Sequence, residues 1–181
     1  KSNSAAYFTA EGCGSKVYAN INVNTIDRGL TISFWVRKDG LSCENACILT
    51  AITGGSWPNQ TTGNLQFRYL DSGYSFVHYN LPDSIEFTDT ENIDNWTHLC
   101  YTNDGHEARI YRNGEVIASQ PNPVEGIVRL GDALDFGNRF CSSKALKGWL
   151  DDIRIYNRAL MEFEIYQLFN EDDYVPQPSG N

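Results

Sequence analysis

The sequence has few of the features by which nucleic-acid-binding and membrane proteins are recognised. It contains 14 Lys and Arg against 23 Asp and Glu, which gives a formal net charge of −9 over 181 residues. Binding to nucleic acid or to an anionic membrane surface requires clustered basic side chains, and the sequence has no such cluster. No apolar run approaches the roughly 20 residues of a membrane-spanning helix. These absences argue against nucleic acid as a partner and against direct insertion into a membrane.

Cysteine is scarce as well. The five cysteines include no CxxC pair and have no histidines at zinc-finger spacing, so a structural zinc site is not expected. Cys43 and Cys47 are near enough in sequence to form one local disulfide, and free thiols in a cytosolic protein are the alternative. Asn59 and Asn95 each begin an N-x-T pattern for glycosylation. Together, the cysteines and the two acceptor sites favour a secreted or cell-surface glycoprotein.

What the sequence does contain is a series of short segments, rich in β-branched and aromatic residues, between turn residues. Asn113-Gly114 is the strongest turn signal, because a type I′ turn needs positive φ at both central positions. Met161, Ile165 and Leu168 recur at helical spacing near the end of the chain. The predicted strands are Ala5–Glu11, Lys16–Val23, Leu30–Lys38, Ile48–Thr53, Asn64–Leu70, Tyr74–Tyr79, Ser84–Thr88, Trp96–Asn103, Glu107–Arg112, Glu115–Ser119 and Trp149–Tyr156, and the predicted helix is Met161–Phe169.

The segments belong to one predicted domain, residues 1–171, because no internal repeat or second compositional regime is visible and β-sandwiches of this size are often undivided. Residues 172–181 contain two Pro, a Gly and acidic side chains, which predicts a linker or a disordered end. The sequence lacks an initiator Met. We therefore expect a piece of a larger multidomain chain.

Three segments carry a family likeness in matching order and spacing. They are LTISFWVR at residues 30–37, WTHLCYTNDGHEARIYRNG at 96–114 and GWLDDIRIYNRALMEFEI at 148–165. They resemble the early strand, the central strand and hairpin, and the closing segment of LamG-like jelly-roll domains in the concanavalin A-like superfamily. The resemblance implies an all-β fold: a two-sheet antiparallel jelly-roll sandwich with one short C-terminal helix.

The resemblance implies a non-catalytic extracellular recognition module, although a fold alone does not fix a function. Carbohydrate binding, as in lectins, is the first hypothesis. The alternative is a protein–protein adhesion or architectural module of a larger extracellular or cell-surface assembly. The expected partner is accordingly a glycan or an extracellular protein.

Calcium is the one cofactor that the resemblance suggests, because concanavalin A-like recognition domains commonly use it. Asp132, Asp135 and Asp151 are the candidate oxygen ligands, and turn or surface positions are the alternative for each of them. The same fold tends to bring its terminal segments side by side, so Cys13 and Cys141 are candidates for a second disulfide. Cys100 would then remain as a buried thiol.

Catalytic residues are not expected, although related folds include β-glucanases. Those enzymes resemble one another in an acidic strand, and Glu86, Asp89 and Glu91 are the nearest match here. Strand side chains alternate, so Glu86 faces away from the other two. His98 and Cys100 would share one face of a strand, but a small core Cys beside a packed His is the simpler interpretation. We predict that the protein is not an enzyme.

The segment from residue 64 to residue 79 predicts a hairpin with a binding face. A loop of Asp71, Ser72 and Gly73 would place one alternate set of side chains in the core and the other set outward. Outward aromatic rings beside hydrogen-bond donors suit a sugar, while an ordinary surface or a face docked to another domain are the alternatives. The predicted ligand-binding residues are Trp57, Gln66, Arg68, Tyr74, Phe76 and His78.

Overall fold

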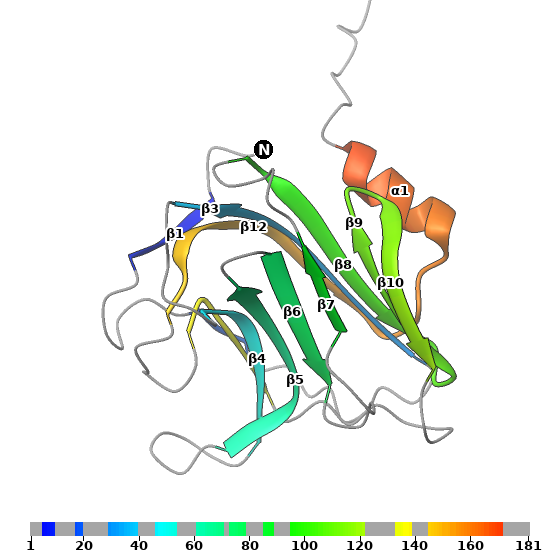
Figure 1. Ribbon diagram of the computed structural model, residues 1–181, viewed down its shortest axis with the longest axis horizontal. Helices are drawn as coiled ribbons and strands as arrows, with labels where there is room; N and C mark the ends of the chain where they lie inside the picture. The colour runs from blue at the N-terminus through cyan, green and yellow to red at the C-terminus, as the bar shows by residue number, and fades with distance from the viewer. Residues whose placement is uncertain are drawn as a thin grey trace, which may run out of the picture.

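The protein is a sandwich of two six-stranded antiparallel sheets (Figure 1). The computed structural model describes residues 5–9, 17–19, 29–39, 46–53, 61–70, 73–78, 85–88, 95–121, 133–138 and 145–171. Sheet A has the order β1 (Ala6–Thr9), β12 (Lys147–Tyr156), β3 (Leu30–Lys38), β8 (Thr97–Asn103), β9 (Glu107–Arg112) and β10 (Glu115–Pro121). Sheet B has the order β2 (Val17–Ala19), β11 (Ala133–Phe136), β4 (Cys47–Thr53), β5 (Thr61–Leu70), β6 (Gly73–His78) and β7 (Ile85–Thr88).

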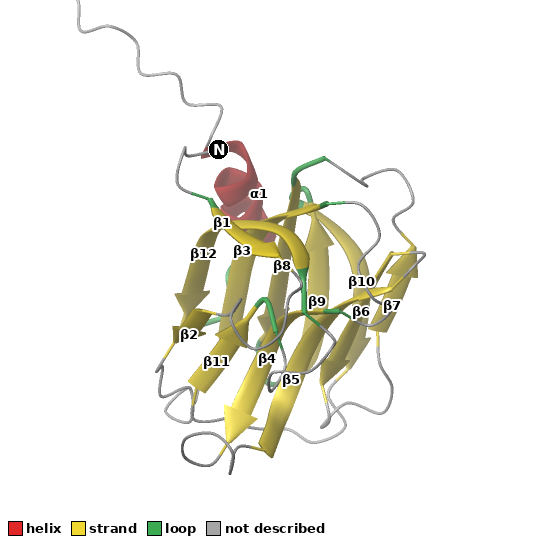
Figure 2. Ribbon diagram, turned by 90° about the vertical axis from the view of Figure 1, so that its left-hand side faces the viewer, coloured by secondary structure: helices red, strands yellow, loops and turns green. Residues whose placement is uncertain are grey.

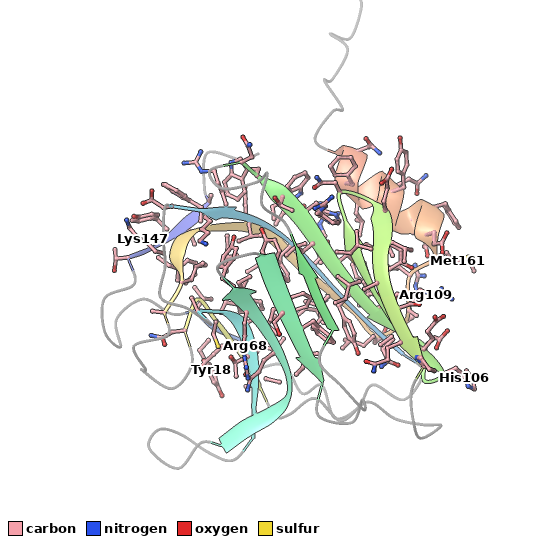
Figure 3. The ribbon with its side chains drawn as sticks, in the orientation of Figure 1. Tyr18, Arg68, His106, Arg109, Lys147 and Met161 are labelled. Carbon is pink, nitrogen blue, oxygen red and sulfur yellow. The ribbon has the colours of Figure 1, made fainter. Side chains whose placement is uncertain are left out.

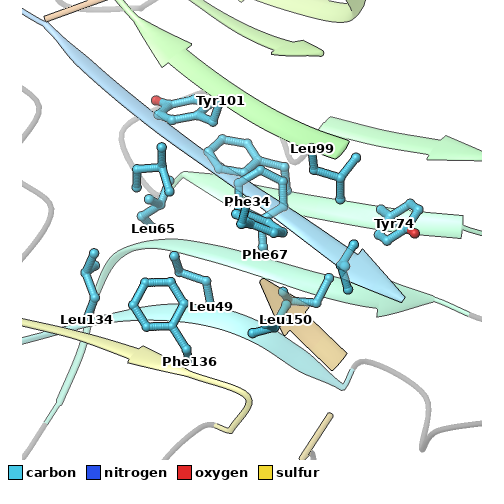
Figure 4. Close-up of a cluster of buried hydrophobic side chains, with 14 of the residues drawn as sticks. Phe34, Leu49, Leu65, Phe67, Tyr74, Leu99, Tyr101, Leu134, Phe136 and Leu150 are labelled. Atoms are coloured by element: carbon cyan, nitrogen blue, oxygen red, sulfur yellow. The ribbon is translucent and has the colours of Figure 1, made fainter. Parts of the chain in front are cut away.

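Alternation along the strands places the core between the two sheets (Figure 4). Phe34 of β3 meets Phe67 of β5 edge-on, with ring centroids 5.3 Å apart. Phe76 of β6 stacks on Tyr101 of β8 at 4.4 Å. Each pair joins one sheet to the other, and burying a side chain of this size contributes about 1.5–3 kcal/mol. Aromatic contacts of this kind therefore hold the two layers together.

The helix α1 (Glu162–Asn170) lies on the face of sheet A that points away from sheet B (Figures 1 and 2). Its buried residues Ile165 and Leu168 pack with Cys100 and Tyr111 in a second, smaller cluster. Phe169 stacks on Trp35 of β3 at 5.7 Å. Among the described residues, no helix is long and apolar enough to span a membrane.

The fold class predicted from the sequence is confirmed, and each predicted strand overlaps an observed one. The short strand β11 was not predicted, because its four residues, ALDF, are few and carry a charged residue at the third position. The predicted helix is displaced by one residue at each end. Residues 172–181 lie outside the described part of the chain, so the predicted tail stays a prediction.

The register of the β5–β6 hairpin differs from the prediction. Leu70 pairs with Gly73, which places Tyr69 opposite Tyr74 and Phe67 opposite Phe76. The prediction assigned Gly73 to the loop, although it is the first residue of β6, and this shifted the pairing by one residue. A shift of one residue moves every side chain to the opposite face of a strand. Tyr74 and Phe76, predicted to face outward and bind ligand, are therefore core residues, with 3% and 0% of their surface exposed.

Candidate functional site

Of the four remaining predicted ligand-binding residues, the structure describes the side chains of Gln66 and Arg68. Trp57 and the side chain of His78 lie outside the described part of the chain. Gln66 and Arg68 of β5 alternate with its core residues and therefore lie on the outer face of sheet B. Arg68, labelled in Figure 3, is half-buried and donates through Nε to Gln66 Oε1 at 2.8 Å. Gln66 itself is fully buried.

The neighbours of Gln66 form a buried polar layer. Strand register places Thr50 of β4 opposite Gln66 and, on its other side, opposite Asp135 of β11. All three side chains have 0% of their surface exposed. Gln66 is therefore shielded from solvent in this arrangement, and ligand binding at Gln66 and Arg68 stays a prediction. The outer face of sheet A is the other surface on which a ligand could bind.

The two predicted calcium ligands that the structure describes, Asp135 and Asp151, do not converge. Asp135 lies on the outer face of sheet B, whereas Asp151 is opposite Trp35 on the outer face of sheet A. Asp132 lies outside the described residues. Because the two sheets separate Asp135 from Asp151, these carboxylates cannot hold the same ion. Within the described ranges, no group of three or more His, Cys, Asp and Glu residues is arranged for a metal. Calcium binding through other residues stays a prediction.

The cysteines and glycosylation sites are only partly described. Cys47 is buried in β4, while Cys13, Cys43 and Cys141 lie outside the described residues, so both predicted disulfides stay predictions. Cys100 carries a free, buried thiol, as expected, and burial raises its pKa. Of the two glycosylation acceptors, Asn95 is exposed and Asn59 is not described. Glycosylation stays a prediction as well.

A Ser–His pair lies beneath α1, where it has no access to substrate. Ser33 Oγ and His98 Nε2 are 2.8 Å apart, and both side chains are buried. The His98 ring lies 6.2 Å from the Phe169 ring, and Cys100 shares the His98 face of β8. The raised pKa of Cys100 opposes formation of a nucleophilic thiolate. This pair is a hydrogen-bonded part of the helix–sheet interface.

The outer face of sheet A carries a second feature, which the sequence analysis missed. Tyr7 of β1 is opposite Trp149 of β12, and Trp149 is opposite Arg37 of β3. Trp96, one residue before β8, lies on the far side of Arg37. We call these four residues the aromatic–arginine row. They alternate with the core residues Phe8, Leu150 and Val36, which explains why all of them point outward.

The row is a continuous series of ring contacts. The Tyr7 and Trp149 ring centroids are 4.6 Å apart. Arg37 Cζ lies 3.9 Å from the centroid of the Trp149 ring and 5.8 Å from that of Trp96. Gly148 allows the backbones of β12 and β3 to approach closely here, because a Cβ at that position would lie 2.3 Å from the Arg37 carbonyl oxygen. Tyr7 is 44% exposed, and the other three residues are half-buried.

Charged groups border the row at its Tyr7 end. The Tyr7 hydroxyl donates to Asp39 Oδ2 at 2.7 Å, and this hydrogen bond raises the pKa of Tyr7. Lys147 Nζ, labelled in Figure 3, is 3.9 Å from the same carboxylate oxygen. Asp39 is therefore held by one hydrogen bond and one ion pair. Aromatic faces with a cation between them form a surface suited to stacking and hydrogen bonding.

The chain is similar to a known protein family and to several solved structures. A model of the concanavalin A-like lectin/glucanases superfamily matches residues 12–166. No curated protein matches the chain significantly.

Three solved structures show similar architecture. The binding domain of botulinum neurotoxin serotype G superposes with a TM-score of 0.72 and 18% identity, over 92% of this chain and 42% of that chain. The binding domain of Paraclostridial Mosquitocidal Protein 1 has a TM-score of 0.68 and 21% identity, over 94% and 44% of the two chains. The binding domain of botulinum neurotoxin DC, in complex with SialylT, has a TM-score of 0.65 and 19% identity, over 88% and 40%. The chain spans less than half of each of these domains. Sequence identities this low show a similarity of fold and nothing more.

Proposed function

Because the chain belongs to the concanavalin A-like lectin/glucanases superfamily, we propose that it is a non-catalytic recognition domain that binds carbohydrate through the aromatic–arginine row. The main support for this proposal is that partly exposed aromatic rings and a guanidinium group lie side by side on one face of sheet A. The C–H face of a sugar ring packs on an aromatic ring, while N–H groups donate to its hydroxyls. The row offers both kinds of contact within four neighbouring residues.

Binding without hydrolysis is supported by the chemistry around the row. Glycoside hydrolysis generally requires two carboxyl groups, about 5–9.5 Å apart, on either side of the scissile bond. Asp39 is the carboxylate that contacts the row in the described part of the chain, and it is held by Tyr7 and Lys147. One engaged carboxylate does not supply both a nucleophile and an acid. Recognition is therefore the role that fits these residues.

The proposed setting is the cell exterior. The exposed position of Asn95 allows it to carry a glycan, and the predicted disulfides belong to an oxidising environment. Among the solved relatives, the binding domain of botulinum neurotoxin DC was determined in complex with SialylT. These points support an extracellular domain with a glycan partner, carried in a longer chain.

Replacing Trp149 by Ala tests the proposed function. A glycan array first identifies a bound oligosaccharide, with and without calcium, and calorimetry then measures its affinity for the variant. We expect binding to weaken by about 1–3 kcal/mol, because a stacking surface and the support of Arg37 are both lost. Tyr166→Ala is the matched control, since Tyr166 is an exposed aromatic residue on α1 and outside the row.

Two results would decide against the proposal. Unchanged affinity of a folded Trp149→Ala protein would show that the glycan binds elsewhere. Loss of thermal stability in this variant, with no glycan bound by the wild-type domain, would show that the row stabilises the fold and does not bind a glycan. That result would favour the adhesion or architectural role.

A further inference from the structure

Arg37 differs from most other described arginines in its partners. Arg109, Arg154 and Arg158 each form an ion pair with a carboxylate. Arg37 has aromatic contacts on its face, and within the described residues no carboxylate forms an ion pair with it. Its Nε is shielded from solvent and has no hydrogen-bond partner. In a protein with nine more acidic than basic residues, this is an uncommon state for a guanidinium group.

The stacking fixes the orientation of the Arg37 guanidinium group. Arg37 Cζ lies 3.9 Å from the centroid of the Trp149 ring, a distance typical of a guanidinium group stacked on an aromatic ring. Because Nε is shielded, the Nη groups are the ones that remain for an external partner. A guanidinium edge donates two parallel hydrogen bonds to one planar carboxylate. The group is thus held in place before any ligand binds, which reduces the entropy lost on binding.

The local charge also favours an anion. At the Tyr7 end of the row, the Lys147 cation offsets the Asp39 carboxylate, so the Arg37 charge is not balanced by Asp39. The Asp39 oxygen already accepts a hydrogen bond from Tyr7 and lies near Lys147. Asp39 is therefore not the partner of Arg37, and an external carboxylate can take that place.

The aromatic rings on both sides of Arg37 indicate which class of ligand bears the carboxylate. A small inorganic anion would use the guanidinium group alone, whereas a sugar acid also places its ring against Trp96 or against Tyr7 and Trp149. From this geometry we infer that the row binds acidic sugars, and that Arg37 receives the sugar carboxylate while the neighbouring rings receive the sugar face. The inference rests on the proposed function and specifies its ligand class.

The test compares each sugar acid with its own methyl ester. Galacturonate, glucuronate and sialic acid oligosaccharides are printed on one array beside their methyl esters and beside sulfated and neutral glycans. Esterification removes the charge and leaves the ring unchanged. We expect wild-type protein to bind the acid about tenfold or more tightly than the ester, the scale of a charge-assisted hydrogen-bond pair.

Two variants of Arg37 assign that preference to its side chain. Arg37→Gln should bind acid and ester with equal, weak affinity, and Arg37→Lys should keep only part of the preference because it loses the planar fork. Arg109→Gln, at a half-buried arginine of β9 outside the row, should behave as wild type. Thermal melting confirms that each variant is folded.

The outcomes separate this inference from the proposed function. Equal binding of acids and esters by the wild type, a preference that survives Arg37→Gln, or a stronger preference for sulfated glycans would each overturn the carboxylate assignment while leaving carbohydrate binding intact. Failure of the folded wild-type protein to bind any glycan on the array would contradict the proposed function itself.

Discussion

The role of an aromatic side chain in this protein depends on which face of its strand it occupies. Phe76 and Tyr7 are both strand residues, yet Phe76 is fully buried between the sheets and Tyr7 is 44% exposed on the outer face of sheet A. Phe76 lies 4.7 Å from the Phe67 ring and 4.4 Å from the Tyr101 ring. A core residue contributes to the free energy of unfolding, while a surface ring is available to a ligand.

Phe76→Ala should therefore destabilise the protein without acting through a binding site. Removing a buried ring loses its transfer free energy and leaves a cavity, at a cost of about 3–5 kcal/mol. Phe163→Ala is the matched control, because Phe163 is 60% exposed on α1, and its cost should stay within about 0.5 kcal/mol. Urea denaturation of both variants measures the difference. Similar values for the two substitutions would contradict the observed β5–β6 register.

At the scale of elements, α1 is joined to the sandwich by polar contacts at its first turn. Both Glu164 carboxylate oxygens accept hydrogen bonds from Arg158, at 2.7 and 2.6 Å. Glu164 also accepts from the Met161 N–H at 2.9 Å. Thr31 Oγ1 accepts from the Leu160 N–H, which ties the preceding segment to β3. An acidic residue in the first turn also suits the helix dipole.

These contacts give stability a dependence on pH that Glu164→Gln should remove. Hydrogen bonds from Arg158, and then from the Met161 N–H, lower the pKa of Glu164 from 4.5 to about 2. A carboxyl group with a lowered pKa stabilises the folded state above its ordinary pKa and loses this effect as the pH falls toward the folded value. The wild type should melt at a higher temperature than Glu164→Gln at pH 7, and the gap should narrow between pH 4.5 and 2. A gap that stays constant over this range would refute the assignment.

The elements could largely be predicted from the sequence, whereas the candidate site could not. Apolar alternation and turn residues located the strands, because both signals are local. The row requires Tyr7, Trp149 and Arg37 to be neighbours, and this follows only from the strand order β1-β12-β3. The hairpin face was predicted in the wrong direction because the assignment of one glycine, Gly73, decides the register. Contacts between distant segments depend on pairing that no single segment encodes.

At the scale of the whole molecule, β8 connects two clusters of buried side chains. Leu99 and Tyr101 point into the core between the sheets, and Cys100 between them points into the smaller cluster beneath α1. Adjacent residues of one strand thus contribute to packing on both faces of sheet A. This arrangement predicts that α1 and the sandwich unfold as one cooperative unit.

Chemical labelling of Cys100 tests this cooperativity. Its thiol is buried and its pKa is raised by burial, so a thiol reagent can react only after the protein opens. If opening is global, Phe76→Ala should raise the labelling rate about a hundredfold or more, because it lowers the free energy of unfolding although Phe76 belongs to the other cluster. Mass spectrometry of the Cys100 peptide follows the reaction apart from the other cysteines, with Phe163→Ala as the control. An unchanged rate in Phe76→Ala would mean that α1 detaches locally, because such an opening exposes the thiol while the core between the sheets stays intact.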